Sequence, residues 1–193
     1  MPTDGLLKKT AIILAVMIGL TLGIGSMLPD EFQVERTLVV NASPDKVWPH
    51  ISQLAKWPKW DPWSHADPQI QHKFVGEPGV GHMMHWAGPS SGRGQFETVE
   101  STHQESIGFK LTVPQVSEPR FLSFKLVDLG GKTQLTWLMR GENSIRPIGN
   151  YFGLGMDRYI GPMYEQGLSN LKSLIETGKI VLPKSDSRPK PVQ

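Results

Sequence analysis

The stretch that decides the fold is residues 155–176, GMDRYIGPMYEQGLSNLKSLIE. Its apolar residues recur three or four positions apart, which is the spacing of one helical face, and charged or amide residues occupy the other face. Gly178 stands where a left-handed cap is expected, and Pro162 predicts either a kink or the start of a second helix. An amphipathic helix that follows many strands must lie on their sheet, because neither element can bury its apolar face alone.

Most of the chain before this helix is predicted to form short strands. A strand over residues 32–41 is followed by a helix in which Ser43 is the N-cap and Pro44 takes the first position. Residues 57–63, WPKWDPW, are broken by two prolines and cannot form a long helix. Further strand-like runs are separated by short turns, which favours antiparallel hairpins over crossovers. These runs are residues 69–75, 81–87, 94–100, 106–113, 120–127 and 132–141.

Composition narrows the class of protein. The chain has 193 residues, enough for one domain with a substantial core plus appendages, and it has no cysteine, which excludes disulfides and thiolate metal sites. The net charge is +2, but residues 30–178 hold 14 basic and 16 acidic side chains. A folded part without a basic excess argues against a nucleic-acid surface.

The N-terminal segment predicts a membrane anchor. Residues 10–28 carry no charge, and about 18 residues at about 1.5 Å each are just long enough for a bilayer core. We therefore expect a single transmembrane helix from Ala11 to Leu28. Lys8 and Lys9 precede it, so the positive-inside rule predicts a cytoplasmic N-terminus and an exported domain, at the inner membrane of a bacterium.

The rival interpretation of this segment is a cleaved signal peptide, because small residues stand near its end. No A-x-A-like cleavage site is present, which favours a retained anchor. The predicted organisation is a lead and anchor over residues 1–31, a folded domain over residues 32–178, and a tail over residues 179–193. The tail is rich in Pro and Lys, and its composition predicts disorder.

Several short motifs point to a family. They are NASPDKVW at residues 41–48, WPKWDPW at 57–63, Gly79-Val80-Gly81 leading to Trp86, Gly92-Arg93-Gly94, KTQLTW at 132–137, and Met156-Asp157 with GLSNLK at 167–172. With the order of elements, they resemble the START-like (helix-grip) superfamily and, more narrowly, its polyketide cyclase/dehydrase-like branch, the SRPBCC proteins. The resemblance covers about residues 34–177. It implies an α+β fold in which a curved antiparallel sheet wraps around the last helix, with an apolar cavity between them.

Strand alternation and helical spacing place many aromatic and Met side chains on the inner wall of such a sheet. A solid core is the alternative interpretation of this pattern, and the resemblance favours a cavity that binds a hydrophobic small molecule or lipid. The predicted lining residues are Trp63, His82, Met84, Trp86, Phe96, Phe109, Trp137, Met139, Met156, Tyr159, Ile160 and Met163.

Few side chains are candidates for catalysis or metal binding. His82 is the titratable group that alternation places on the wall, as a polar handle or proton carrier, although a structural histidine near the sheet edge is the favoured interpretation. With Tyr159 and Arg140 it forms a weak set of catalytic candidates. His82 and His85 point to opposite faces of a strand, so we predict no metal site, and no cofactor is indicated. Residues 88–92, GPSSG, match G-x-S-x-G, but a strand follows them and we expect a hairpin turn.

Three functions are open at this point. The preferred one is a membrane-anchored domain that binds a hydrophobic molecule. The second is a cyclase- or dehydrase-like enzyme that uses the same pocket. The third is a non-catalytic accessory protein of the cell envelope, for which the sequence indicates no particular protein partner.

Overall fold

The computed structural model describes residues 3–114, 116, 118–143 and 145–180. The predicted tail lies almost wholly outside the described residues. In chain order the elements are α1 (Thr3–Met27), β1 (Glu31–Val40), α2 (Pro44–Ser52), the 3₁₀ helix η1 (Leu54–Lys59), α3 (Pro62–Ala66), β2 (Gln71–Val75), β3 (Met83–Gly88), β4 (Gly92–Thr102), β5 (Ser106–Thr112), β6 (Arg120–Asp128), β7 (Thr133–Glu142) and α4 (Ile148–Thr177).

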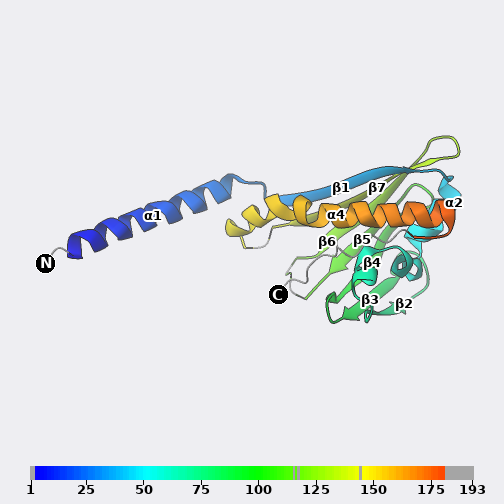
Figure 1. Ribbon diagram of the computed structural model, residues 1–193, viewed down its shortest axis with the longest axis horizontal. Coiled ribbons are helices and arrows are strands. Elements are labelled where there is room, and N and C mark those ends of the chain that lie inside the picture. The colour runs from blue at the N-terminus through cyan, green and yellow to red at the C-terminus, as the bar shows by residue number, and fades with distance from the viewer. Residues whose placement is uncertain (1–2, 115, 117, 144, 181–193) are drawn as a thin grey trace.

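The strands form one antiparallel sheet of seven, in the order β1-β7-β6-β5-β4-β3-β2. Short connections join consecutive strands from β2 to β7, and β1 forms the other edge of the sheet by pairing with β7. The helices α2, η1 and α3, which lie between β1 and β2 in the chain, cover the inner face. Helix α4 crosses that concave face alongside β1 (Figure 1). The predicted helix-grip fold is confirmed.

Helix α4 is longer than predicted and unbroken. It begins at Ile148 rather than at residue 155, and it continues through Pro162, so the predicted second helix does not form. The missing N–H of Pro162 costs one helical hydrogen bond, while the buried Gly161 and Tyr164 hold the helix on the sheet on either side of it. The predicted cap is confirmed: Gly178 is left-handed at φ 72°, and its N–H donates to the Leu174 carbonyl at 3.0 Å.

Aromatic rings fill the space between the second half of α4 and the sheet. Trp57 of η1 and Trp60, which follows the end of η1, are buried, and their indole N–H groups donate to the carbonyls of Ile51 and His50 at 3.0 and 3.1 Å. The Trp60 ring lies 5.6 Å from Trp137. Both indole rings therefore belong to the core.

An ion pair fastens the middle of α4 to β1. Arg36 donates to Asp157 at 2.7 Å and to Glu165 at 2.6 Å. Its guanidinium occupies the space above Gly161, where any side chain would collide with it. The hydrogen bond from Arg36 holds the pKa of Asp157 below its usual range.

Helix α1 extends away from the sheet (Figure 1). Its segment Gly5–Met27 is long and apolar enough to cross a membrane, and only 6% of its most apolar window is buried by the rest of the chain. Its last turns contact the start of α4: Asn150, itself buried, donates to the Gly25 carbonyl at 3.0 Å, and the Tyr151 hydroxyl donates to the Thr21 carbonyl at 2.6 Å.

Candidate functional site

The structure divides the predicted lining residues into three groups by exposure. Five lie in the buried core: His82, Met84, Phe109, Trp137 and Met139. Six are half-buried: Trp63, Trp86, Phe96, Met156, Ile160 and Met163. Tyr159 is 59% exposed and does not pack against the sheet as expected, because it lies on a different side of α4 from the buried Gly161 and Tyr164.

The half-buried group marks the end of the concave face at which β1 and β6 begin, called here the α1 end of the sheet. Phe96 pairs with Leu111, and Leu111 pairs with Arg120, the first residue of β6. On the other side of Arg120 the row continues through Gly141 to Phe32. A mostly apolar row with one arginine therefore crosses the concave face beneath the first half of α4.

Arg120 has no neutralising partner within the described residues. Its Nε is buried without a hydrogen bond, and its guanidinium carbon lies 5.1 Å from the centre of the Phe32 ring. Burial lowers the pKa of Arg120. A buried polar group is nearly always paired, so an orphaned donor on an inner wall needs an explanation. Sequence reasoning missed Arg120, although alternation with the buried Leu122 and Phe124 would have placed it on the wall.

Two further buried polar atoms near this wall also lack a hydrogen-bond partner among the residues that the structure describes. The hydroxyl of Tyr164 and the indole N–H of Trp137 are buried and make no hydrogen bond to any described residue. Burial raises the pKa of Tyr164, and the positive charge of Arg120 opposes that rise. Helical spacing places Tyr164 on the apolar face, although the predicted lining includes Tyr159 and not Tyr164.

The catalytic candidates are not brought together. His82 is buried immediately before β3, and its Nδ1 has no partner among the described residues. Tyr159 is exposed on α4, while Arg140 is on the outer face of β7 and donates to Gln33 at 3.3 Å. This arrangement assembles no acid–base pair from these three residues.

The G-x-S-x-G stretch is a hairpin turn, as expected. It connects β3 to β4, and the backbone N–H groups of Ser90 and Ser91 donate to Asp67 at 2.9 and 2.8 Å. No helix follows Ser90, so the strand–turn–helix geometry of a hydrolase nucleophile is not built here. Across the described ranges, no group of three His, Asp or Glu side chains is arranged to hold a metal ion.

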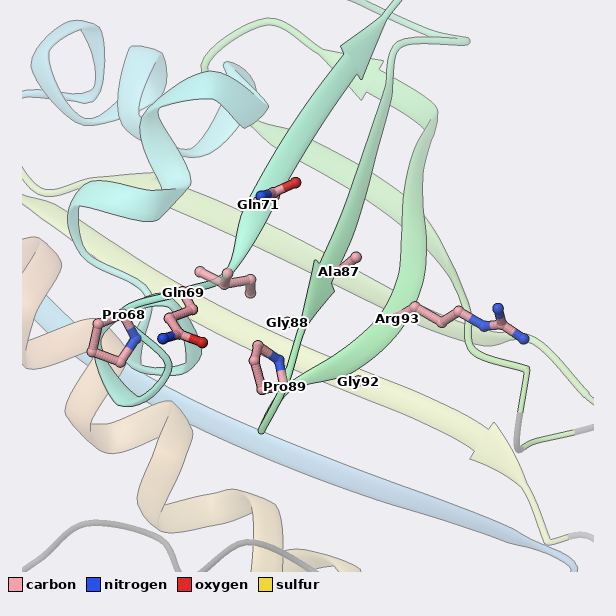
Figure 2. A pocket seen from close by; sticks show the side chains of 9 residues that line it. Pro68, Gln69, Gln71, Ala87, Gly88, Pro89, Gly92 and Arg93 are labelled. Atoms are coloured by element: carbon pink, nitrogen blue, oxygen red, sulfur yellow. The ribbon is translucent and has the colours of Figure 1, made fainter.

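An open hollow of about 980 Å³ lies beside this turn. Figure 2 shows Pro68 and Gln69, from the link between α3 and β2, on one side of it and Gly88 and Pro89 on the other. A second hollow of about 310 Å³ is lined by outer-face residues such as Phe121 and Arg140. Neither hollow lies between α4 and the sheet, so the cavity expected there stays a prediction.

Comparison with known proteins gives a family and a fold. Residues 31–176 match the family model described as polyketide cyclase / dehydrase and lipid transport. No curated protein matches the chain. Among solved structures, protein CV1439 from Chromobacterium violaceum is 20% identical, with a TM-score of 0.51 over 77% of this chain and 99% of its own.

Two further solved structures illustrate the range of proteins that share the fold. Truncated norcoclaurine synthase from Thalictrum flavum is 12% identical, with a TM-score of 0.58 over 76% of this chain and 94% of its own. The Aha1 dimer from Colwellia psychrerythraea is 15% identical, with a TM-score of 0.52 over 76% and 98%. At such identities the likeness shows the fold alone.

Proposed function

The chain belongs to the polyketide cyclase/dehydrase and lipid transport family, and from that premise we propose that it is a membrane-anchored domain that binds a hydrophobic small molecule or lipid beneath the first half of α4. The observation that carries the proposal is Arg120, a half-buried cation in an otherwise apolar row, whose buried Nε has no hydrogen-bond partner among the described residues.

The apolar part of the ligand would lie against the half-buried side chains. Trp86 and Phe96 are already in contact, with ring centroids 5.1 Å apart, and Met156, Ile160 and Met163 lie on α4. Removing such surfaces from water contributes about 25 cal/mol per Å² before the costs of association. Met side chains also adapt to irregular ligand shapes.

The polar part of the ligand would supply the missing acceptor. Arg120, Tyr164 and Trp137 each offer an N–H or O–H that lacks a partner among the described residues. An oxygen-bearing group, most favourably a carboxylate or phosphate, would accept from Arg120 and neutralise its charge. The proposed ligand is therefore amphipathic, with an acidic head and an apolar body.

The same proposal includes a retained anchor. Asn150 and Tyr151 donate to the backbone carbonyls of Gly25 and Thr21 in α1, so cleavage after Gly25 would remove a partner of each, including one partner of the buried Asn150 amide. Lys8 and Lys9 orient the N-terminus toward the cytoplasm, so the domain would be exported at a bacterial inner membrane.

The test uses the full chain in amphipol and two brominated probes, dibromostearate and its methyl ester. Bromine quenches indole fluorescence on contact, and α1 contains no tryptophan, so quenching reports the domain. We expect saturable quenching by dibromostearate, with the methyl ester binding more weakly. Arg120→Met should weaken dibromostearate binding by about tenfold or more, since a hydrogen bond to a charged group contributes about 1.5–3 kcal/mol.

Arg140→Met is the matched control, because Arg140 lies on the outer face of the neighbouring strand. Absence of saturable quenching by either probe would overturn the binding proposal. Equal binding of dibromostearate by Arg120→Met and Arg140→Met would show that the ligand needs no acidic head to bind.

A further inference from the structure

Large apolar side chains are exposed beside the end of α1. They belong to the turn before α4 and to its first half, and they are between 51% and 80% exposed: Ile145, Ile148, Phe152, Leu154 and Tyr159. These five residues are called here the α4 patch. Exposed apolar side chains gathered in one place indicate an interaction surface rather than chance.

The patch is confined to one half of the helix. Within it, Ile148, Phe152 and Tyr159 are four and seven residues apart, so they share one side of α4, whereas Leu154 points to another side of the same half. Continued from Tyr159 in steps of seven, the same side carries the polar residues Gln166 and Ser173, and Thr177 follows four positions later. The apolar half is the one that contacts α1, and the polar half is the one farther from it (Figure 1).

Specific contacts fix the patch against the last turns of α1. Asn150 and Tyr151, between Ile148 and Phe152, donate to the carbonyls of Gly25 and Thr21. Gly25 permits this approach, since a Cβ there would lie 2.8 Å from the Tyr151 ring and 2.9 Å from the Pro147 carbonyl. An ion pair between Arg146 and Asp30, 2.7 Å long, spans the same junction.

The length of α1 sets the depth of this junction. Its candidate membrane-spanning segment, Gly5–Met27, extends about 35 Å, and the uncharged part after Lys9 extends about 27 Å, close to the roughly 30 Å of a bilayer core. Thr21 lies six residues before the end of α1, about 9 Å along its axis. The first turns of α4, tied to this carbonyl, would therefore lie where hydrocarbon meets the lipid headgroups, the depth that tyrosine side chains and amphipathic helices favour.

We infer that the α4 patch is a lipid-contacting surface that embeds the first half of α4 in the same bilayer that α1 spans. This inference rests on the anchor in the proposed function, but not on ligand binding. The α1 end of the sheet, with Arg120 and the half-buried apolar row, then faces the membrane. An amphipathic ligand would pass between bilayer and domain without crossing water.

The chain has no cysteine, so single cysteines can be introduced and labelled with bimane in an otherwise unchanged sequence. Phe152→Cys reports the patch and Val16→Cys reports the anchor. Val80→Cys is the matched control: Val80 is an exposed apolar residue between β2 and β3, at the other end of the strands. The full chain is reconstituted in phosphatidylcholine and phosphatidylglycerol vesicles with brominated acyl chains.

We expect the labels at positions 152 and 16 to lose fluorescence in brominated vesicles and the label at 80 to keep it. Quenching at 16 but not at 152 would overturn the inference while leaving the anchor in place. Quenching at neither site would overturn the anchor and the patch together. Self-quenching of the 152 label between chains, without quenching by brominated lipid, would assign the patch to a second copy and overturn the inference.

Discussion

The ring of Tyr164 lies flat on the indole of Trp137, with ring centroids 3.8 Å apart and planes inclined by 13°. This stack joins α4 to β7 at the centre of the concave face. Gly167, one turn along α4, permits the close approach, because a Cβ there would lie 2.8 Å from the Trp137 ring. Both stacked side chains also carry a buried polar atom without a partner in the described part of the chain. The ring of Tyr164 and its hydroxyl can therefore contribute to stability in two separate ways, which different substitutions distinguish.

Replacing Tyr164 tests the two roles. Tyr164→Ala should lower the free energy of unfolding by about 3–5 kcal/mol, as for other large aromatic truncations. Tyr164→Phe should leave it unchanged or raise it by about 1 kcal/mol, because it removes a hydroxyl that is buried without a hydrogen bond. Guanidinium unfolding of the full chain in detergent, followed by tryptophan fluorescence, measures both. A clear loss of stability in Tyr164→Phe, larger than in the exposed Tyr159→Phe, would show that the hydroxyl has a partner.

Asp61 predicts a pH dependence. It is buried and caps α3, accepting from the N–H groups of Trp63 and Ser64 at 2.9 and 3.0 Å. Burial raises its pKa above the ordinary 3.8, and the hydrogen bonds oppose the rise only in part. The folded state therefore binds the Asp61 proton more tightly than the unfolded state, and stability should fall as pH rises from 3.8 through the raised pKa.

Asp61→Asn keeps an accepting oxygen for the cap but cannot titrate. The difference in free energy of unfolding between this variant and the parent chain should grow in favour of the variant as pH rises above about 4, until the raised pKa of Asp61 is passed. Urea unfolding at a series of pH values measures it. A difference that is constant with pH would contradict the raised pKa.

The ion pairs of Arg36 predict a pH dependence of stability opposite in sign to that of Asp61. Arg36→Gln should lower the free energy of unfolding by roughly 1 kcal/mol, since both carboxylate partners are more than half exposed. The pKa of Asp157 is lowered, so its contribution is present above about pH 4 and is lost as pH falls through the lowered pKa. Urea unfolding near neutral pH and at acid pH checks this, with the neighbouring Arg158→Gln as control. Equal effects of the two variants would contradict it.

Gly25 predicts how α1 and α4 stay joined. Gly25→Val would place a side chain against Tyr151 and the Pro147 carbonyl, so we expect the start of α4 to detach from α1. Gly23→Val is the matched control, because a Cβ at Gly23 meets no atom within 4 Å. Hydrogen exchange of the full chain should be faster over residues 145–155 in Gly25→Val only. Unchanged exchange in both variants would show that the junction does not depend on this close contact.

Local patterns were sufficient for the elements of the fold. The alternation of residues 120–127 and the helical spacing of residues 155–176 each predicted an element at its place, because the period of buried side chains is a property of adjacent residues. Turn chemistry worked for the same reason, as the GPSSG hairpin and the Gly178 cap show. The start of α4 was predicted too late because its first turn contacts α1, which no local pattern records.

By itself, then, the sequence determined the strands, the amphipathic helix and an apolar N-terminal segment. The tertiary structure decided which side of α4 is covered, and so made Tyr164 rather than Tyr159 a core residue. It also decided that the half-buried Arg120 has no hydrogen-bond partner for its Nε among the described residues, and that the apolar first half of α4 contacts α1. The physical reason is that periodicity gives the direction of a side chain relative to its own element, whereas burial and pairing depend on elements that lie far away in the chain.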